Sequence, residues 1–360
     1  MRLVVDAVVG LPGSVAIVLE HLTRGWSETF PEDEITVLFG PESHRFPLPE
    51  GVRAEVLERP RGPVGGLWLR SVSIRRAAKR LRADAVIVGV PASALAGTRA
   101  PRGVILYDLR FELRPDQFSR KARIARTISW AWSLRLADGI FTISERTLTD
   151  FRDLHPALAA RAVAAPLGSD HALAWTRPPA GDRPYAIAFG HFSNKNADAV
   201  IAGWAEFCAS SGPDGPGWLL RLVGMGSADR AASTEEVRRL GIEEHVELMP
   251  WLDDDAFQSC FTGAGLVVFP SDFEGFGLPA AEALRLGIPT VISADPALAE
   301  VTGGHAITVR STTATDLADG IRRALALTPD QLAAGQSFAQ AFTWRRTAEV
   351  IRAGLPPATE

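Results

Sequence analysis

The chain has few lysines and cysteines and no long apolar run. Only three of its 38 basic residues are lysines, so each lysine position is informative. Two cysteines, Cys208 and Cys260, exclude a disulfide scaffold and a four-cysteine zinc site, and they fit a reducing compartment. No apolar run approaches the ~20 residues that a membrane-spanning helix needs. The first residues, MRLVVDAVVG, form a strand-like run and lack the pattern of a cleavable signal peptide.

What is present is a globular composition with unevenly distributed charge. Hydrophobic residues make up 46% of the 360 residues, and the chain is long enough for two domains. Residues 1–172 carry 24 Lys and Arg against 19 Asp and Glu, whereas the remainder carries 14 against 23. The basic excess is concentrated in residues 60–135, mainly in the predicted helices at 73–82 and 114–135. Two interpretations stay open: a solvated face, or contact with an anionic membrane or a phosphate-bearing acceptor.

Short β-branched runs alternate with helix-like stretches along the whole chain. Apolar runs of this kind are typical of strands buried on both faces of a parallel sheet. They occur in two series, with predicted strands at 2–8, 35–39, 84–90, 103–107 and 138–144, and then at 185–190, 218–224, 245–250, 265–270 and 289–293. Two such series predict an α/β protein with two doubly wound, Rossmann-like domains. Ligands are expected in a cleft at the carboxyl ends of the strands.

The predicted domains are residues 1–172 and 173–340. A C-terminal helical segment, 341–360, is expected to pack back toward the first domain. The stretch Trp175–Pro184 is rich in Pro and Gly and has no apolar periodicity, so it is interpreted as the interdomain linker.

The most informative stretch is SDFEGFGLPAAEALRLG, residues 271–287. Its first glutamate, Glu274, follows a predicted strand, and its second, Glu282, lies about one turn into a helix that starts near Pro279 and ends before Gly287. Glycines before the helix let the backbone approach a ligand closely. The first N–H groups of the helix, with its dipole, favour anionic or hydroxyl oxygens. The stretch predicts a ligand site, and a plain helix entry with two solvated glutamates is the alternative.

Within this stretch, EGFGLPAAE resembles the E-x7-E motif of retaining glycosyltransferases of family 4, which have the GT-B fold. The resemblance runs through the second half of the chain, and PLGSD and LADGIFTISERTLTDF ahead of it fit as well. It implies a GT-B fold, with an N-terminal acceptor-binding domain and a C-terminal nucleotide-sugar-binding domain facing a central cleft. It also implies a metal-independent, retaining transfer of a hexose-like sugar from a nucleoside diphosphate to an acceptor hydroxyl, in an α-type linkage.

The same resemblance implies roles for individual residues. Glu282 would hold the ribose hydroxyls, Glu274 would contact hydroxyls of the transferred sugar, and Lys195 would bind the diphosphate. Further donor contacts are implied for Gly13, Ser14, Gly190, His191, Trp251, Leu252, Gly275, Phe276, Gly277 and Leu278. For Gly13 and Ser14 a plain strand-to-helix loop is the alternative. No cofactor is implied beyond the nucleotide sugar, which is itself a substrate.

Two positions depart from the family pattern. His191 stands where many members have an arginine directed at the diphosphate, and a histidine with a pKa near ~6.5 predicts tighter binding near pH 6 than near pH 8. Tyr107 replaces a histidine beside the anomeric carbon, and Asp108 follows it. Tyr107 either orients the sugar or packs at the cleft floor. Tyr107 and Asp108 join Glu274 and Lys195 as the candidate catalytic residues.

Other motifs and functions are compatible with parts of the sequence. Asp253–Asp255 contain a D-x-D pattern, but capping of the following helix explains it, and no metal is predicted. A nucleotide-sugar epimerase or phosphorylase on the same fold stays open, as does a non-catalytic sugar-nucleotide-binding subunit. The expected location is cytoplasmic, alone or with peripheral contact at the inner membrane face. The acceptor is open and includes lipid-linked or anionic molecules; no nucleic-acid partner is predicted.

Overall fold

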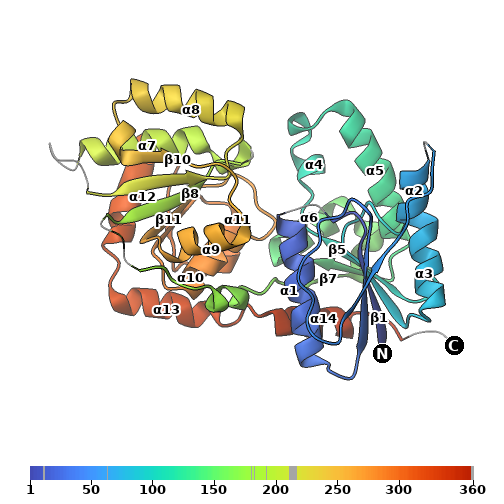
Figure 1. Ribbon diagram of the computed structural model, residues 1–360. Coiled ribbons are helices and arrows are strands. Elements are labelled where there is room, and N and C mark those ends of the chain that lie inside the picture. The colour runs from blue at the N-terminus through green and yellow to red at the C-terminus, as the bar shows by residue number, and fades with distance from the viewer. Residues whose placement is uncertain are drawn as a thin grey trace. The chain divides into compact units, whose positions relative to one another are not determined.

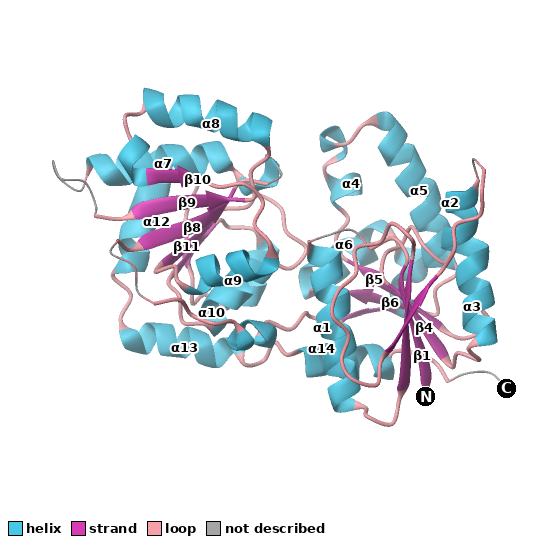
Figure 2. Ribbon diagram, viewed as in Figure 1, coloured by secondary structure: helices cyan, strands magenta, loops and turns pink. Residues whose placement is uncertain are grey.

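The computed structural model describes residues 1–10, 13–62, 64–179, 181, 183–191, 193–210 and 217–357. They form two compact α/β units (Figure 1). Unit 1 combines Met1–Gly168 with the chain from Phe342 onward, and unit 2 is Ser169–Ala341. Each unit has one sheet with helices packed around it (Figure 2).

Unit 1 contains a seven-stranded parallel sheet in the order β3-β2-β1-β4-β5-β6-β7. Its strands are β1 (Arg2–Ala7), β2 (Glu34–Phe39), β3 (Arg53–Val56), β4 (Ala85–Val88), β5 (Arg102–Leu106), β6 (Gly139–Thr142) and β7 (Ala162–Ala164). Its α-helices are α1 (Ser14–Thr29), α2 (Gly65–Trp68), α3 (Ile74–Arg80), α4 (Arg110–Leu113), α5 (Arg120–Arg135), α6 (Glu145–Leu154) and α14 (Trp344–Ala353). The β-branched runs form central strands because both faces are covered: α3 and α6 pack on one core, and α1 and α14 line the other.

The C-terminal helix α14 is part of unit 1. A Cβ on Gly25 of α1 would lie 2.7 Å from Cβ of Trp344, so the glycine allows the two helices to approach closely. Thr347 donates to the carbonyl of Pro166 at 2.6 Å. Arg352 lies 3.1 Å from the buried carboxylate of Asp33, which anchors the end of the helix.

Unit 2 contains a six-stranded parallel sheet in the order β10-β9-β8-β11-β12-β13. Its strands are β8 (Tyr185–Phe189), β9 (Leu219–Val223), β10 (Val246–Leu248), β11 (Leu266–Phe269), β12 (Thr290–Ile292) and β13 (Ile307–Thr308). Its α-helices are α7 (Ala197–Ala209), α8 (Ser227–Arg239), α9 (Asp254–Thr262), α10 (Leu278–Arg285), α11 (Pro296–Thr302), α12 (Ala314–Leu325) and α13 (Pro329–Ala339). Aliphatic side chains of α7 and α12 pack on one face of this sheet. On the other face, Phe189 of β8 contacts Phe257 and Phe261 of α9.

The boundary between the units differs from the expected one. It falls after residue 168, and the stretch Trp175–Pro184 lies inside unit 2 instead of linking the domains. Trp175 packs edge-on against Phe261 at 5.5 Å, and Arg183 donates to the carbonyls of Trp218 and Glu244. Pro and Gly indicate irregular backbone. The contacts of Trp175 and Arg183 fix that backbone to unit 2, and amino-acid composition does not predict such contacts. Residues 180 and 182 of this stretch lie outside the described part.

Both cysteines, Cys208 and Cys260, are buried free thiols. Within the described residues, none of the helices combines the length and the apolar character required to cross a bilayer.

Candidate functional site

The candidate site lies in unit 2 at the carboxyl ends of β8 and β11. β8 is the first strand of this unit and lies between β9 and β11 in the sheet. The chain therefore adds strands first on one side of β8 and then on the other, so the loops that follow β8 and β11 diverge. Ligands of doubly wound sheets bind at such a reversal of strand order.

Two oppositely charged side chains meet at this point. Nζ of Lys195, in the 3₁₀ turn after β8, lies 2.5 Å from Oε1 of Glu274, in the loop after β11. The two side chains are only 9% and 14% exposed. The ammonium also lies 4.3 Å from the ring centroid of Phe269, within range of a cation–π attraction. Because little water screens the pair, it presents a positioned cation and a positioned carboxylate to a ligand.

Asparagines on both sides of Lys195 fix the loop that carries it. The side-chain amide of Asn194 donates to Oγ of Ser271 at 3.0 Å. The backbone carbonyl of Asn194 accepts from that hydroxyl at 2.9 Å and from the N–H of Asp272 at 3.0 Å. Asn196 has a left-handed conformation, with φ of 55°, and donates to the carbonyl of residue 270. The sequence predicts a role for the lysine, and the structure adds these two asparagines. The available signal was NKN itself, since asparagine tolerates this conformation and its amide bonds to backbone groups.

Helix α10 begins beside Glu274. Gly277, directly before the helix, has φ of 97°, and a Cβ on it would lie 2.4 Å from Cδ2 of Leu298. Within the described part of the chain, the N–H groups of Gly277 and Leu278 have no protein acceptor, as is usual at a helix start, and they can bind ligand oxygens. Gly275 is partly buried and Phe276 is buried beside them.

The second carboxylate of the motif, Glu282, is buried in α10 and has a specific partner. Its Oε1 lies 3.1 Å from Nε2 of His171, and both side chains are 4% exposed. The ring of Trp175 packs edge-on against His171, with centroids 5.4 Å apart. This histidine directly follows the segment PLGSD and was not among the predicted site residues. His171 fixes the direction in which the Glu282 carboxylate points.

His191 lies two residues after the end of β8 and is placed against two aromatic rings. Its ring is 5.3 Å from that of Trp251 and 6.2 Å from that of Phe189. Gly190 is packed so closely against Met225 that a Cβ would come within 2.3 Å of its Cγ. Trp251 is 58% exposed, and Leu252 beside it is partly buried.

The surroundings of His191 keep it neutral. Burial, with the nearby charge of Lys195, lowers the pKa of His191 from 6.5 to about 4. Without a bound donor the ring is therefore uncharged at both pH 6 and pH 8, whereas the sequence predicted a cationic His191 near pH 6. Tighter donor binding at pH 6 would require His191 to take up a proton from the solvent when the donor binds. Calorimetry in buffers of different ionisation enthalpy measures such an uptake.

The depressed pKa of His191 predicts a pH dependence of stability. Between about pH 6.5 and pH 4 the unfolded chain binds a proton at this residue that the folded chain does not, so stability falls as the pH falls. We expect wild type to lose about 2 kcal/mol more than His191→Asn between pH 7 and pH 5. Thermal unfolding at the two pH values measures this difference. Asp6, whose pKa burial raises to about 6, acts with the opposite sign but is common to both proteins. Equal losses in the two proteins would contradict a neutral, buried His191.

The predicted site residues of unit 1 lie at the start of α1 and directly after β5. Gly13 has φ of 92° directly before α1, and Ser14 is the exposed first residue of that helix. The hydroxyl of Tyr107 is buried and has no partner among the described residues, and burial raises its pKa well above the ordinary range. It stays protonated and can donate a hydrogen bond, but it is no base. Asp108 accepts from the N–H of Arg110 at 2.9 Å.

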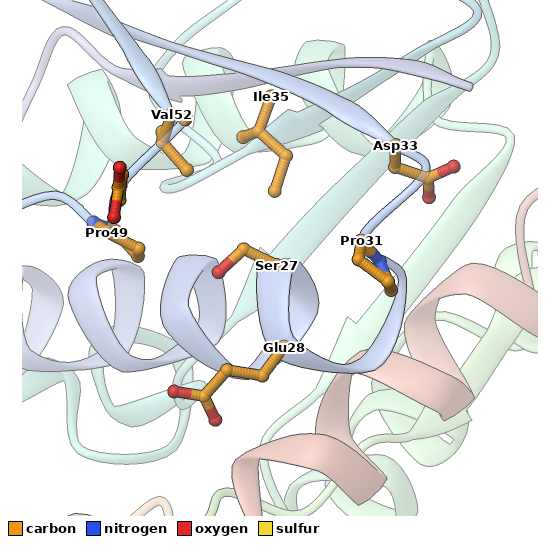
Figure 3. Close-up of a pocket in the computed structure, with 9 residues that line it drawn as sticks. Ser27, Glu28, Pro31, Asp33, Ile35, Pro49 and Val52 are labelled. Carbon is orange, nitrogen blue, oxygen red and sulfur yellow. The ribbon is translucent and has the colours of Figure 1, made fainter.

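Two further features lie outside this site. Asp253 caps α9 by accepting from the N–H of Ala256 at 2.9 Å, which accounts for the first carboxylate of the D-x-D pattern. A pocket in unit 1, shown in Figure 3, is lined by Ser27 and Glu28 of α1 and by Ile35 near the start of β2. It lies toward the amino end of that strand, away from the carboxyl ends where ligands of such sheets bind.

The sequence profile of the family "Glycosyl transferases group 1" matches residues 174–338, which include the candidate-site residues of unit 2 except His171. The match takes in most of unit 2 and somewhat less than half of the chain, so unit 2 is similar to the group 1 glycosyl transferases. The resemblance predicted from the E-x7-E motif is thereby confirmed. Over 164 residues the chain is 30% identical to the D-inositol 3-phosphate glycosyltransferase of Corynebacterium aurimucosum. That match covers 43% of this chain but only 38% of the relative's length.

Solved structures extend the likeness to the whole fold. The sucrose-phosphate synthase of Thermosynechococcus elongatus superposes with a TM-score of 0.76, at 18% identity, over 98% of this chain and 97% of that one. HepE of Anabaena, crystallised with UDP and glucose, superposes with a TM-score of 0.75, also at 18% identity, over 98% of both chains. The predicted GT-B fold with two Rossmann-like domains is confirmed by this likeness and by the two parallel sheets.

Proposed function

We propose that this protein is a glycosyltransferase that moves a hexose-like sugar from a nucleoside diphosphate to an acceptor hydroxyl, with retention and without a metal. The observation that carries the proposal is the buried Lys195–Glu274 pair beside the start of α10. A diphosphate needs a cation and N–H donors, whereas a sugar needs a carboxylate that accepts from its hydroxyls. The loops after β8 and β11 together supply all three.

In the proposed reaction, the bond between the anomeric carbon and the diphosphate oxygen breaks, and the acceptor oxygen bonds to the same face of the sugar. The acceptor proton passes to the departing phosphate oxygen. Lys195 and the N–H groups of Gly277 and Leu278 stabilise the negative charge that develops on the diphosphate. Glu274 orients the sugar, and Glu282 holds the ribose. Unit 2 is thus assigned to the donor and unit 1 to the acceptor.

A donor screen followed by a hydrolysis assay tests this function. Each nucleoside diphosphate is added in turn while the thermal unfolding temperature is followed, because a ligand that binds the folded state raises it. UDP is tested first, since HepE of Anabaena was crystallised with UDP and glucose. Matching nucleotide sugars are then assayed for slow release of sugar to water. Release supports a transferase; binding with neither release nor transfer to any acceptor would instead support a non-catalytic subunit.

We expect Glu282→Ala to weaken donor binding by about 10- to 100-fold, because one charged acceptor of the ribose hydroxyls is lost. His171→Ala should weaken binding in the same direction but less, and His171→Gln, which keeps an N–H donor near Nε2, should restore most of it. Titration calorimetry with the nucleoside diphosphate measures all three. Unchanged affinity in Glu282→Ala would contradict the proposal that Glu282 binds the ribose. Unchanged affinity in His171→Ala alone would show that His171 contributes to packing but does not orient Glu282.

We also propose a cytoplasmic location. Nucleoside-diphosphate sugars are cytoplasmic substrates, and the two buried thiols are compatible with a reducing compartment. Fractionation of cells that produce the full chain would test this, with recovery outside the cytoplasm as the contrary result.

A further inference from the structure

Helix α5 directs an apolar stripe outward. Ile124, Ile128 and Trp132 are 58%, 66% and 56% exposed, and Leu136, directly after the helix, is 38% exposed. Their spacing of four residues places them on one side of the helix. The stripe extends over roughly 18 Å at 1.5 Å per residue. We call these four residues the α5 stripe.

The α5 stripe is not the face that holds the helix to unit 1. That face is made by Ser133 and Leu134, which are buried, and by Trp130, whose ring packs against Phe111 at 4.7 Å. The helix therefore has apolar residues on the core side and again on the side away from it. A solvated helix would carry polar residues there. The second stripe calls for an apolar or interfacial partner.

A neighbouring helical segment extends the exposed apolar surface. Leu67 and Trp68 of α2 are 51% and 41% exposed. The loop around Leu95 joins the two elements, because its carbonyl accepts from Nε1 of Trp132 at 2.8 Å and its N–H donates to the carbonyl of Arg70 at 3.2 Å. Figure 1 shows α5 beside α2 and α3.

The two segments that carry the exposed apolar residues are basic and contain no carboxylate. No Asp or Glu occurs from 118 to 137 or from 59 to 83. Lys121 precedes Ile124 and Ile128 by three and seven residues, and Arg135 follows Trp132 by three, so these cations flank the stripe on the same side. Within the described residues, none of the five cations of α5 forms an ion pair with a carboxylate.

We infer that the α5 stripe binds the surface of an anionic lipid bilayer. A helix of this kind lies in the plane of the interface, with its apolar side among the headgroups and upper acyl chains. Long basic side chains reach from that depth to the phosphates, and tryptophan prefers the same boundary. Two segments without acidic residues, 118–137 and 59–83, favour anionic lipid as the partner. The inference is independent of the proposed transfer, because binding to vesicles needs neither donor nor turnover.

Co-sedimentation of the full chain with vesicles tests the inference. Vesicles of phosphatidylcholine and phosphatidylglycerol, in about a two-to-one ratio, are compared with pure phosphatidylcholine at low and high salt. We expect binding to the mixed vesicles at low salt, loss of most of it at high salt, and little binding to the neutral vesicles. The double variant Ile124→Gln/Ile128→Gln should bind about tenfold or more weakly. Lys121→Gln/Arg135→Gln should reduce binding and its dependence on salt.

A matched control is Leu154→Gln in α6. Leu154 is also exposed, at 41%, but lies outside the α5 stripe, so this variant should bind as wild type does. Thermal unfolding checks that all variants are folded. Absence of binding to mixed vesicles at low salt would overturn the inference. Equal loss in Leu154→Gln would do the same. Self-association that Ile124→Gln/Ile128→Gln abolishes, without vesicle binding, would assign the stripe to a second copy of the chain instead.

Discussion

Lys195→Met is expected to lower kcat/KM for transfer by about 10²- to 10³-fold, because it removes a positioned cation from the leaving diphosphate in a poorly solvated site. Methionine keeps the aliphatic stem of lysine while the charge is lost. Steady-state assays of transfer and of donor hydrolysis measure the effect. Lys195→Arg tests geometry at constant charge, since a planar guanidinium does not reproduce a compact ammonium. Wild-type kcat/KM in a folded Lys195→Met would place the leaving-group cation elsewhere.

The ion pair between Lys195 and Glu274 also predicts an effect on stability. In Lys195→Met the Glu274 carboxylate stays buried without its counterion, which should lower stability by about 3–5 kcal/mol. The double variant Lys195→Met/Glu274→Gln should regain much of that stability but not the activity. Glu274→Ala alone should act mainly on turnover, by about 1–3 kcal/mol, because it contacts the reacting sugar. A double variant no more stable than Lys195→Met would show that the two side chains are not coupled.

The second large effect is expected at Gly277. Gly277→Ala forces an L side chain into φ of 97° and brings its Cβ within 2.4 Å of Cδ2 of Leu298, which is fully buried. Backbone strain and overpacking each cost about 1–3 kcal/mol. The unfolding temperature should fall by several degrees, and donor affinity should fall with it, because the first N–H groups of α10 must shift.

Gly304→Ala is the matched control for this prediction. Gly304 has φ of 82°, but an added Cβ would meet nothing within 4 Å, so this variant carries the backbone strain without the collision. Its unfolding temperature should fall less, and its donor affinity should equal that of wild type. Gly277→Ala/Leu298→Ala should lose less stability than the sum of the single changes, because the second change makes room for the first. Strict additivity, or equal effects at both glycines, would contradict the contact with Leu298.

Local signals in the sequence determined much of the architecture. The two series of β-branched runs predicted two Rossmann-like domains, because strands buried on both faces need apolar residues at every position. The glycines and Pro279 predicted a helix start between Glu274 and Glu282, because each of these residue types restricts or frees the backbone within its own few residues. The rarity of lysine drew attention to Lys195.

Contacts between distant residues were decided only by the tertiary structure. Lys195 and Glu274 are 79 positions apart, and His171 and Glu282 are 111 apart. Their pairing depends on the order of strands in the sheet, which the strand sequences alone do not encode. The neutral state of His191 likewise follows from burial and from Lys195 nearby, neither of which is visible in the residue type.

The α5 stripe illustrates the same limit on a surface. The sequence showed basic helical segments with interspersed aromatic residues, and it left a solvated face and a membrane contact open. A repeat of apolar residues shows that a helix has an apolar side, but not which side meets the core. Only the packing of Trp130 and Leu134 inward, with Ile124, Ile128 and Trp132 left outward, separated the side of α5 that stabilises the fold from the side that is free to bind.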